Sequence, residues 1–564
     1  MQDEQTQDEQ TQVLIVGGGM VGLAAAVFSA WHGVRTLLVE RHPEILVHPR
    51  ARGINARSVE LLRQVGLEER LFAARGEGIV ASDEDSSRML VADSLASADH
   101  SFVDLATGEA EGVSPCEWCP IDQDRLEGIL RTRAEELGAE IRFHTEFEEL
   151  TQDALGVTAV LRDRATGERR TVRAGHLVAA DGQRSPVRES LGIPVEGPGV
   201  LLHTVSVVVE ADLGKVLRGR RFGFAYLNRP EQGAVIFPHD GDKRWCFGTP
   251  YHPDRGETVD DYPEERCLDL FREATGDPTL TGRLIAQLPS DGTKVLPFVI
   301  GAQCAERFSE GRVFLAGDAA RIVPPTGAFG GSAGIQDAHN LAWKIAAVVR
   351  GEAGSELLAT YDAERRAVSE FTMEQAMAQM VGRTGNKAAD VGGVRVHDWW
   401  SVVLGYRYRS AAVLSDEADG GDGAYGAEGA DESPAIPPQL LCAQPGTRAP
   451  HLPLERDGAA LSTLDLYGRH FVLVAGASGE AWREAAARSC TALDVPLDFH
   501  RIGGDLRDPA GRWAARHGVK EGGAVLVRPD GFVAWRAEDG DRAEERLTEA
   551  LTRVLSTRPV DRAS

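Results

Sequence analysis

Apolar positions near the start of the chain follow the pattern of a strand, a helix and a second strand. The run Val13–Val16 is continuously apolar, as in a fully buried parallel strand, and a glycine-rich turn and a helix to about His32 follow it. A second apolar run, Thr36–Val39, completes the unit. This order predicts the opening of a parallel α/β domain.

The same pattern returns late in the chain. Residues 312–320, RVFLAGDAA, predict another short buried strand, and apolar residues at helical spacing follow it: Ile335, Ala338, Leu341, Ala342, Ile345, Ala346 and Val349. Between the two parts, residues 196–294 contain many short β-rich runs, such as LLHTVSVVVEAD and GAVIFPHD. We therefore expect an α/β domain formed by residues 13–195 and 295–400, interrupted by a β-sheet domain at 196–294 to which part of 75–120 contributes.

Two segments lack a hydrophobic period. Residues 1–12 repeat the unit QDEQT and predict a disordered tail, because so polar a segment cannot bury enough surface to offset its ordering entropy. Residues 410–440 are acidic and rich in Gly and Pro, which predicts a linker or a mobile loop.

Beyond them, residues 441–556 contain the apolar runs FVLVAGAS and GGAVLVRPDGFVAWR and predict a small α/β domain.

Composition excludes several classes of partner. The chain has 564 residues and a formal net charge of −25, and a field of that sign repels nucleic acids and acidic membrane surfaces. The chain has no apolar run of membrane-spanning length, and its start lacks a basic region followed by an apolar one. The seven cysteines are too scattered for a disulfide framework or a metal site. We expect a cytoplasmic monomer or homodimer without bound metal.

The turn after the first strand carries a G-x-G-x-x-G pattern. Gly17 permits the tight turn, Gly19 lets the backbone approach a pyrophosphate, and Gly22 lets helix and strand pack closely. Glu40 ends the second strand 18 residues after Gly22, where a carboxylate can accept the hydroxyls of a ribose. Because that carboxylate would repel a 2′-phosphate, the pattern favours FAD or NAD over NADP. The sequence thus predicts a Rossmann-like dinucleotide site.

Two later strand ends favour a flavin. Asp181-Gly182 follows one apolar strand, and Gly317-Asp318 follows another, ahead of a glycine-rich loop and a helix. Asp318 is suited to the ribityl hydroxyls of a flavin. The positive end of the helix is suited to the negative charge of a reduced isoalloxazine. We therefore expect noncovalently bound FAD.

Together these motifs resemble the class A FAD-dependent aromatic hydroxylases, the family of para-hydroxybenzoate and phenol hydroxylases. The resemblance runs from about Val13 to Val349 and more weakly to the chain end. It is strongest to bacterial hydroxylases of aromatic polyketide pathways, whose C-terminal phrases are matched at Gln444–His451 and Gly523–Gly531. It implies FAD contacts at Gly17, Gly19, Val21, Gly22, Glu40, Arg41, Arg50, Gln123, Asp181, Gly317, Asp318, Pro325, Gly330, Gly331 and Ser332.

The loop before the late helix departs from the pattern PPTGGFGGNTGIQDA that is common in these polyketide hydroxylases. Ala328 stands in place of a glycine, Ser332 of an asparagine and Ala333 of a threonine. Arg321 stands where histidine is frequent. These departures affect the expected fine position of the flavin.

The resemblance implies an FAD-dependent monooxygenase. Such enzymes reduce the flavin with NADPH or NADH, react it with O2 to a C4a-hydroperoxide, and pass the terminal oxygen to an electron-rich ring. We expect a small phenolic, polycyclic and polyketide-derived substrate, with the β-sheet domain shielding the flavin from water. The catalytic candidates are backbone groups of Pro324, Pro325 and Gly330, and the substrate-contact candidates are Tyr226, Phe237, Pro238 and His239.

Alternatives share the same cofactor. Baeyer–Villiger oxygen insertion and hydroxylation of a simple phenol remain open, because fold alone does not separate outcomes. Halogenation is disfavoured, since no W-x-W-x-I-P motif occurs among the nine tryptophans. A flavin-containing scaffold protein is a further possibility.

Two features of cysteine usage have structural interpretations. Cys116 and Cys119 have the spacing of a redox dithiol, but no thioredoxin-like strand leads into them. The C-terminal domain resembles the thioredoxin-like domain of phenol hydroxylases, yet GASG at 476–479 lies where a dithiol would be expected. We expect neither feature to carry a redox step.

Overall fold

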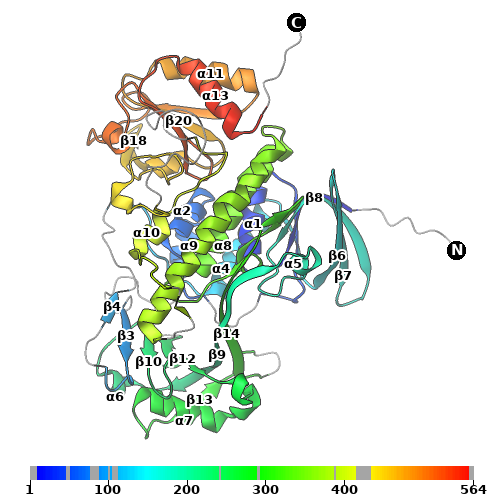
Figure 1. Cartoon of the computed structure of the whole chain (residues 1–564), viewed down its shortest axis with the longest axis vertical. Helices are drawn as coiled ribbons and strands as arrows, with labels where there is room; N and C mark the ends of the chain where they lie inside the picture. The colour runs from blue at the N-terminus through cyan, green and yellow to red at the C-terminus, as the bar shows by residue number, and fades with distance from the viewer. Residues whose placement is uncertain are drawn as a thin grey trace, which may run out of the picture.

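The computed structural model describes residues 9–45, 51–75, 88–98, 102–104, 112–239, 243–288, 292–385, 389–390, 392–414 and 433–557. Residues 1–8 of the expected tail, Arg50 and residues 415–432 of the expected linker lie outside this described part. Figure 1 shows a first unit with a mostly parallel sheet in the middle, a second unit with a mostly antiparallel sheet at one end, and the C-terminal unit at the other end.

The first sheet has eight strands among the described residues, in the order β15-β16-β8-β1-β2-β5, with β7 joining β6 to β8. Its strands are β1 (Glu9–Val16), β2 (Thr36–Val39), β5 (Glu140–Arg142), β6 (Thr145–Asp153), β7 (Gly156–Asp163), β8 (Arg169–Ala179), β15 (Ser309–Glu310) and β16 (Val313–Leu315). β16, β8, β1, β2 and β5 run parallel to one another, whereas β15 pairs antiparallel with β16 and β7 antiparallel with β8. The predicted parallel, Rossmann-like sheet is confirmed.

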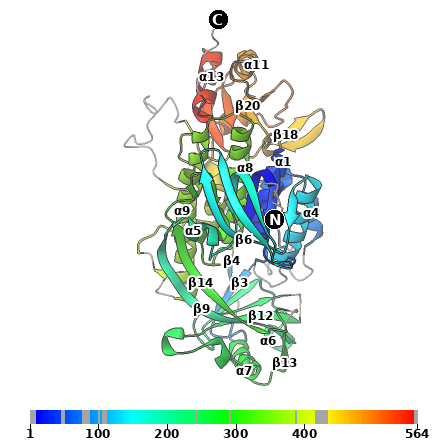
Figure 2. The same ribbon diagram turned by 90° about the vertical axis from the view of Figure 1, so that its right-hand side faces the viewer.

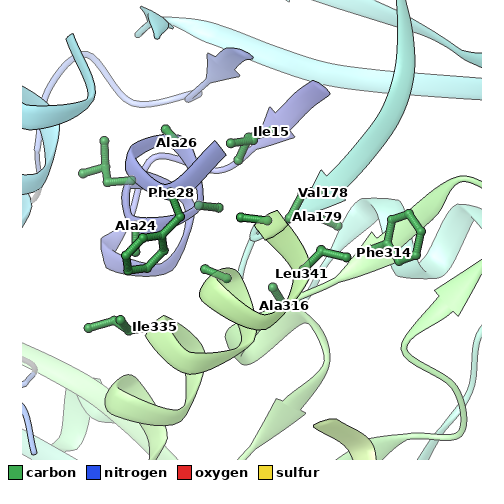
Figure 3. Packing of buried hydrophobic residues seen from close by; sticks show 14 of the residues in the cluster. Ile15, Ala24, Ala26, Phe28, Val178, Ala179, Phe314, Ala316, Ile335 and Leu341 are labelled. Atoms are coloured by element: carbon green, nitrogen blue, oxygen red, sulfur yellow. The ribbon is translucent and has the colours of Figure 1, made fainter. Parts of the chain in front are cut away.

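Helix α1 (Met20–Trp31) packs against the first sheet, α4 (Gln123–Glu136) and α8 (Gly330–Val349). Figure 3 shows Phe28 of α1, Ile15 of β1 and Leu341 of α8 in one apolar layer. The neighbouring helices are α2 (Ala56–Gln64), α3 (Glu68–Ala73), α5 (Pro186–Ser190), α9 (Ala359–Thr384) and α10 (Trp399–Leu404). None of the helices in the described ranges is long and apolar enough to cross a membrane.

β1 begins earlier than the apolar pattern indicates. Residues 9–12, which we assigned to the disordered tail, belong to β1, and residues 9–11 pair with β8. The Glu9 carboxylate contacts the Arg142 guanidinium at 2.8 Å, and the side chain of Gln12 accepts from the backbone amide of Arg35 at 2.8 Å. These residues are held by main-chain pairing and polar contacts at the sheet end, so hydrophobic periodicity does not reveal them.

The second sheet has nine strands in the part of the chain that the structure describes, in the order β17-β14-β9-β12-β11-β10-β3-β4, with β13 beside β9. Helices α6 (Gly214–Leu217) and α7 (Glu264–Thr275) contribute to an apolar cluster with it. The strands are β3 (Arg88–Ala92), β4 (Phe102–Asp104), β9 (Val195–Ala211), β10 (Phe224–Leu227), β11 (Ala234–Pro238), β12 (Arg244–Pro250), β13 (Gly282–Ile285), β14 (Val295–Ala305) and β17 (Arg321–Ile322).

The return to the first unit lies later than the expected boundary at residue 295. β14 pairs antiparallel with β9 from Val295, opposite Val207, to Ala305, opposite Val195. Figures 1 and 2 show these two long strands running side by side from the second sheet toward the first. The two strands that connect the units are thus paired with each other, with register shifts at Ile300/Gly301 and Ala302/Cys304, and the first sheet resumes only at β15.

The C-terminal unit has a thioredoxin-like α/β arrangement. Its four-stranded sheet has the order β21-β20-β22-β23, and β18 and β19 form a separate hairpin. Helices α11 and α13 pack against each other, and both contribute to an apolar cluster with this sheet. The elements are β18 (Pro453–Arg456), β19 (Ala459–Ser462), β20 (Phe471–Ala475), α11 (Ala481–Leu493), β21 (Leu497–Arg501), α12 (Trp513–Arg516), β22 (Ala524–Val527), β23 (Val533–Ala537) and α13 (Ala543–Val554).

The described start of the expected linker is buried rather than free. The hydroxyl of Ser410 donates to the Glu364 carboxylate at 2.6 Å, and the amide of Leu414 donates to the carbonyl of Ala534 at 2.8 Å. Ala412 and Val413 are also buried. The acidic, Gly-rich composition on which we based the linker belongs mainly to residues outside the described part.

A buried carboxylate joins the C-terminal unit to α2. Glu60 accepts from Arg57 at 2.9 Å, from Arg448 at 2.9 and 2.5 Å, and from the Ser114 hydroxyl at 2.6 Å. Its side chain is 2% exposed. Burial alone would raise the pKa of Glu60, but Arg448 and Arg57 hold it below its usual value. The charges compensate each other only while all three remain together.

We expect Glu60→Gln to lower the free energy of unfolding by about 3–5 kcal/mol, because two buried guanidinium groups would lose their counter-ion. Chemical denaturation measures the loss. Glu136→Gln is the matched control, since Glu136 also lies between two arginines, Arg70 and Arg133, but is solvent-exposed, so its loss should be far smaller than that of Glu60→Gln. Equal losses for the two variants would contradict this account.

Candidate active site

Four of the expected site residues follow directly after parallel strands of the first sheet. Gly17 follows β1, Glu40 follows β2, Asp181 lies just beyond β8, and Gly317 lies just beyond β16. The carboxyl ends of parallel strands meet at one edge of a sheet, where ligands of open α/β folds bind. The structure therefore brings these residues to a common edge.

The three glycines of the first turn meet different requirements. Gly17 has φ of +108°, and a Cβ on it would lie 2.3 Å from the carbonyl oxygen of Ala180. A Cβ on Gly22 would lie 1.9 Å from the carbonyl oxygen of Gly17. At Gly19, by contrast, the nearest heavy atom to a Cβ is the Glu127 carboxylate at 3.7 Å. The fold thus requires Gly17 and Gly22, whereas the missing side chain of Gly19 leaves space at the start of α1.

Glu40 is held in place by the turn beside it. Its carboxylate accepts from the amides of Gly18 at 2.6 Å and His42 at 2.9 Å, and contacts the His42 ring at 2.5 Å. Burial alone would raise the pKa of Glu40, but the hydrogen bonds from His42 and Gly18 lower it. The carboxylate is therefore ionised and oriented, while Arg41 beside it is exposed.

A carboxylate that sequence reasoning missed lies at the start of α1. Glu127 of α4 is 3% exposed and accepts from the amide of Met20 at 2.9 Å and from the Gln123 side chain at 2.7 Å. Gln123 in turn pairs with both backbone groups of Ala51, at 3.1 and 3.3 Å. The expected contact Gln123 is thus tied to the start of α1. Nothing in the IDQDRLE stretch marks its last residue, Glu127, as a site residue, because a glutamate in a helix usually lies on an exposed face.

Asp181 has unsatisfied acceptor capacity. Its Oδ2 accepts from the amide of Val187 at 3.1 Å, whereas its Oδ1 is buried with no hydrogen-bond partner among the described residues. Burial raises the pKa of Asp181. A buried acceptor at this edge fits a ligand that carries hydroxyl donors.

The start of α8 packs onto the start of α1. A Cβ on Gly317 would lie 2.8 Å, and one on Gly334 2.4 Å, from Val21 Cγ2. A Cβ on Gly331 would lie 2.5 Å from Cε of Met20. These glycines let the two helix starts and the turn after β16 meet, and Asp318 on that turn is exposed beside buried neighbours.

The loop before α8 is folded back on itself. Pro324 is buried and Pro325 is exposed. The indole of Trp399 donates to the carbonyl of Gly327 at 3.1 Å. Gly327 and Ala328 both have positive φ, at +86° and +56°. Ala328 thus occupies a left-handed conformation that favours glycine.

An aromatic face of the second sheet points toward the first unit. Phe224 stacks on Phe237 with centroids 5.0 Å apart, and Tyr226 lies 4.9 Å from Phe224. Register places these residues on the face opposite Ala225 and Ile236, which lie in the apolar cluster with α7. Phe224 and Phe237 are only partly buried.

Two arginines from the first unit flank this face. Arg52 lies 5.9 Å from the Phe237 ring centroid and donates to the carbonyls of Pro238 and, at 3.1 Å, His239. Arg383 at the end of α9 lies 5.9 Å from the Tyr226 ring centroid. The structure therefore brings all four expected substrate residues to the boundary between the units.

The comparisons with known proteins agree with this geometry. An FAD binding domain family matches residues 10–376, and an aromatic-ring hydroxylase C-terminal family matches residues 443–557. Tetracenomycin A2 monooxygenase-dioxygenase of Streptomyces glaucescens is 42% identical, with 97% of each chain covered. 4-Methyl-5-nitrocatechol 5-monooxygenase of Burkholderia sp is 39% identical, covering 97% of this chain and 98% of the relative.

A solved structure shares the whole architecture. Aklavinone-11 hydroxylase, crystallised with FAD and aklavinone, has a TM-score of 0.87 and 37% identity, with 98% of this chain and 100% of that chain covered. The chain belongs to the FAD-dependent aromatic-ring hydroxylases. FAD is accordingly the cofactor of this hydroxylase, and the expected family, fold class and enzyme class are confirmed.

The residues at the sheet edge fit FAD. The space at Gly19, the ionised Glu40 and the unsatisfied Asp181 oxygen supply a phosphate approach, a ribose acceptor and a hydroxyl acceptor. Arg50 lies outside the described residues, so its expected contact stays a prediction.

The structure shows what two of the residues that depart from the family's loop pattern, Arg321 and Ser332, contact. Arg321 is buried and forms an ion pair with Asp337, which fixes it beneath the loop. Ser332 is 1% exposed, and its hydroxyl accepts from the amide of Asn55 at 3.0 Å. We expected a cofactor contact at Ser332, but this side chain faces α2, so a contact there would be made by its backbone.

The cysteine pair has the properties of structural thiols. Cys116 and Cys119 are both free and buried, and Cys116 donates to the Glu68 carboxylate at 3.5 Å. Burial raises the pKa of Cys119 to about 11, and it raises that of Cys116 further. Both are therefore protonated thiols, which are poor nucleophiles. The described residues contain no group of three or more His, Cys, Asp or Glu that could hold a metal ion.

We expect Gly19→Val to abolish FAD binding while the chain still folds, because the branched side chain would fill the space left for the pyrophosphate. Circular dichroism and flavin absorbance after FAD titration measure the two properties separately. Gly33→Ala is a control glycine substitution, since a Cβ there meets nothing within 4 Å, although its φ of +79° predicts a small loss of stability. Stoichiometric FAD on folded Gly19→Val would refute the assignment of this turn.

Ala328→Gly should relieve strain in the loop, because an alanine in the left-handed conformation costs about 1–2 kcal/mol and a glycine does not. The greater conformational entropy of glycine in the unfolded chain offsets part of this gain. We expect a small rise in melting temperature, or none, measured on the FAD-loaded chain. Ala333→Gly, inside α8, is the contrasting variant and should lower the melting temperature. A clear loss of stability in Ala328→Gly would show that the backbone is not held at this φ.

Proposed function

We propose that this hydroxylase uses NADPH or NADH and O2 to hydroxylate a phenolic ring of a polycyclic, polyketide-derived aromatic substrate. The observation that carries the proposal is the aromatic face at the boundary with the FAD-binding unit, where Phe224 and Phe237 are partly exposed and Tyr226 is buried beside them. Aromatic faces bind flat aromatic ligands by stacking. The tetracenomycin relative and the aklavinone-bound neighbour support a polycyclic ligand.

The cofactor would lie along the carboxyl edge of the first sheet. We assign the pyrophosphate to the start of α1 at Gly19, the ribose to Glu40, and the ribityl chain to Asp318 with Asp181 nearby. The isoalloxazine would meet the backbone of the loop from Pro324 to Gly331. Bound FAD supplies electron transfer from the nicotinamide and activation of O2.

We propose a division of labour between the units. Residues 13–195 and the segments that return to the first sheet from β15 onward would bind FAD. The second sheet would cover the isoalloxazine and hold the substrate, and the C-terminal unit from residue 441 would carry no thiol chemistry. A sheet that covers the site excludes water. Exclusion of water prevents unproductive side reactions.

Tyr226 would hold a proton at the substrate. Burial raises the pKa of Tyr226, with Arg383 opposing that effect, so its hydroxyl stays neutral and can donate to a substrate oxygen. The positive charge of Arg383 favours the ionised form of a phenol bound beside it. An ionised phenol has a more electron-rich ring, which suits hydroxylation.

A simple phenol is the second candidate substrate. The Burkholderia relative is named for a single-ring nitrocatechol, and it covers this chain as completely as the tetracenomycin relative does. Baeyer–Villiger oxygen insertion on the same cofactor stays a further alternative, and the two outcomes yield different products.

The purified chain, loaded with FAD, should therefore incorporate one atom from 18O2 into a hydroxyl of a polycyclic substrate. The substrate panel is an anthraquinone, an angucycline and a simple phenol, each tested with NADPH and with NADH. Mass spectrometry of the products detects the label, and Gly19→Val is the control variant. Label only in the simple phenol would favour the second candidate. Label in a lactone or ester would favour oxygen insertion, and no label in any product would exclude monooxygenation of these classes.

A further inference from the structure

The turn between β22 and β23 inserts from the C-terminal unit into the FAD-binding unit. We call residues Arg528–Phe532 the 528–532 turn. The side chains of Arg528, Asp530 and Phe532 are all buried, at 0%, 2% and 1% exposure. Their partners lie on α2, α8, α9 and the segment before the expected linker. Neither the fold nor the comparisons assign a role to this insertion.

Charged residues of the turn hold the middle of α8. Arg528 donates to both oxygens of Glu364 on α9, at 2.5 and 2.8 Å. Asp530 accepts from Asn340 at 3.1 Å and from the Trp343 indole at 3.2 Å, both on α8. Lys344 of α8 completes the cluster by donating to Glu364 at 2.8 Å. Every member of this group is at most 3% exposed, so the pairing leaves little freedom for α8 to slide.

A second set of contacts leads from the turn to the first turns of α8. Phe532 stacks on Tyr408 with centroids 4.0 Å apart. The Tyr408 hydroxyl accepts from Arg365 at 3.1 Å, and Arg365 also donates to the carbonyl of Ala333 at 3.2 Å. Ala333 is the fourth residue of α8.

Arg365 reaches the turn after β16 as well. It donates to Oδ1 of Asp337 at 2.7 Å, and Oδ2 of Asp337 accepts from the amide of Gly317 at 3.1 Å. Gly317 directly precedes Asp318, to which we assign the ribityl chain, and the start of α8 belongs to the loop to which we assign the isoalloxazine. Arg365 is fully buried, so a donor that loses its acceptor cannot turn to water instead.

We propose that the 528–532 turn is a positioning element for the flavin: through Phe532, Tyr408 and Arg365 it sets where the first turn of α8 and Gly317 lie against the isoalloxazine. The proposal rests on the proposed function for the FAD site. It gives the C-terminal unit a role in tuning the flavin that does not require a redox thiol.

Tyr408→Phe tests the relay with a minimal change. The ring and its stack on Phe532 remain, and only the hydroxyl that accepts from Arg365 is lost. The matched control is Tyr262→Phe, which removes a buried tyrosine's hydroxyl bond to Glu257 at 3.0 Å on the second-sheet unit. Both variants should remain folded, with Tyr408→Phe melting below the parent chain because Arg365 loses a buried acceptor.

The readout is sulfite binding to the oxidised flavin, followed by loss of flavin absorbance in FAD-loaded full-length protein. Sulfite adds to the flavin ring, and its dissociation constant depends on the positive potential that the surrounding backbone supplies. We expect Tyr408→Phe to change that constant by about threefold or more, since a misplaced buried donor alters the local field. Phe532→Leu should change it in the same direction, whereas Tyr262→Phe should leave it unchanged.

Unchanged sulfite constants in both Tyr408→Phe and Phe532→Leu would overturn the positioning role while leaving the proposed function intact. A changed constant in Tyr262→Phe of equal size would also overturn it, because any lost hydroxyl bond would then suffice. Failure of the parent chain to hydroxylate any aromatic compound, with the sulfite shifts present, would contradict the proposed substrate but uphold the positioning role. A parent chain without FAD would overturn both.

Discussion

Helix α8 is buried on all sides, and the rest of the structure depends on satisfying its polar side chains. Every residue from Ser332 to Ala347 is buried, yet the helix carries Asp337, Asn340 and Lys344. A buried charge is tolerated only when it is paired and hydrogen-bonded. The partners come from β17 of the second sheet, from α9 and from the C-terminal unit, so no single unit can hold α8 by itself. This requirement explains why the units pack into one molecule.

The same constraint prepares the cofactor edge. Asp337 fixes the amide of Gly317 from below, while Val21 fills the space that Gly317 and Gly334 leave. The start of α8 therefore lies against the start of α1, where backbone amides gather. Figure 3 shows the apolar layer beneath this contact, formed by α1, β8 and α8. The fold thus places two helix starts at the sheet edge and the aromatic face of the second sheet at the unit boundary.

Local sequence patterns were sufficient to predict the parts of the site that are formed by the backbone. The run at Val13–Val16, the glycine turn and the strand Thr36–Val39 predicted the first βαβ unit, because their periods and turns are set by neighbouring residues. Partners far apart in the chain were not predictable. Glu127 of α4, which holds the start of α1, lies over 100 residues from it in the chain, and β14 pairs back to β9 beyond the expected boundary at residue 295. The buried charges of α8 and α9 have the sequence pattern of an exposed helix face.

The flavin carried by the purified chain tests the central claim most directly. Acid denaturation followed by chromatography of the supernatant measures both its identity and its amount. The account predicts one released FAD for each chain, because the sheet edge offers a phosphate approach, a ribose acceptor and hydroxyl acceptors but the site requires no covalent bond. A colourless chain that takes up no FAD, released FMN, or flavin retained in the protein precipitate would contradict it.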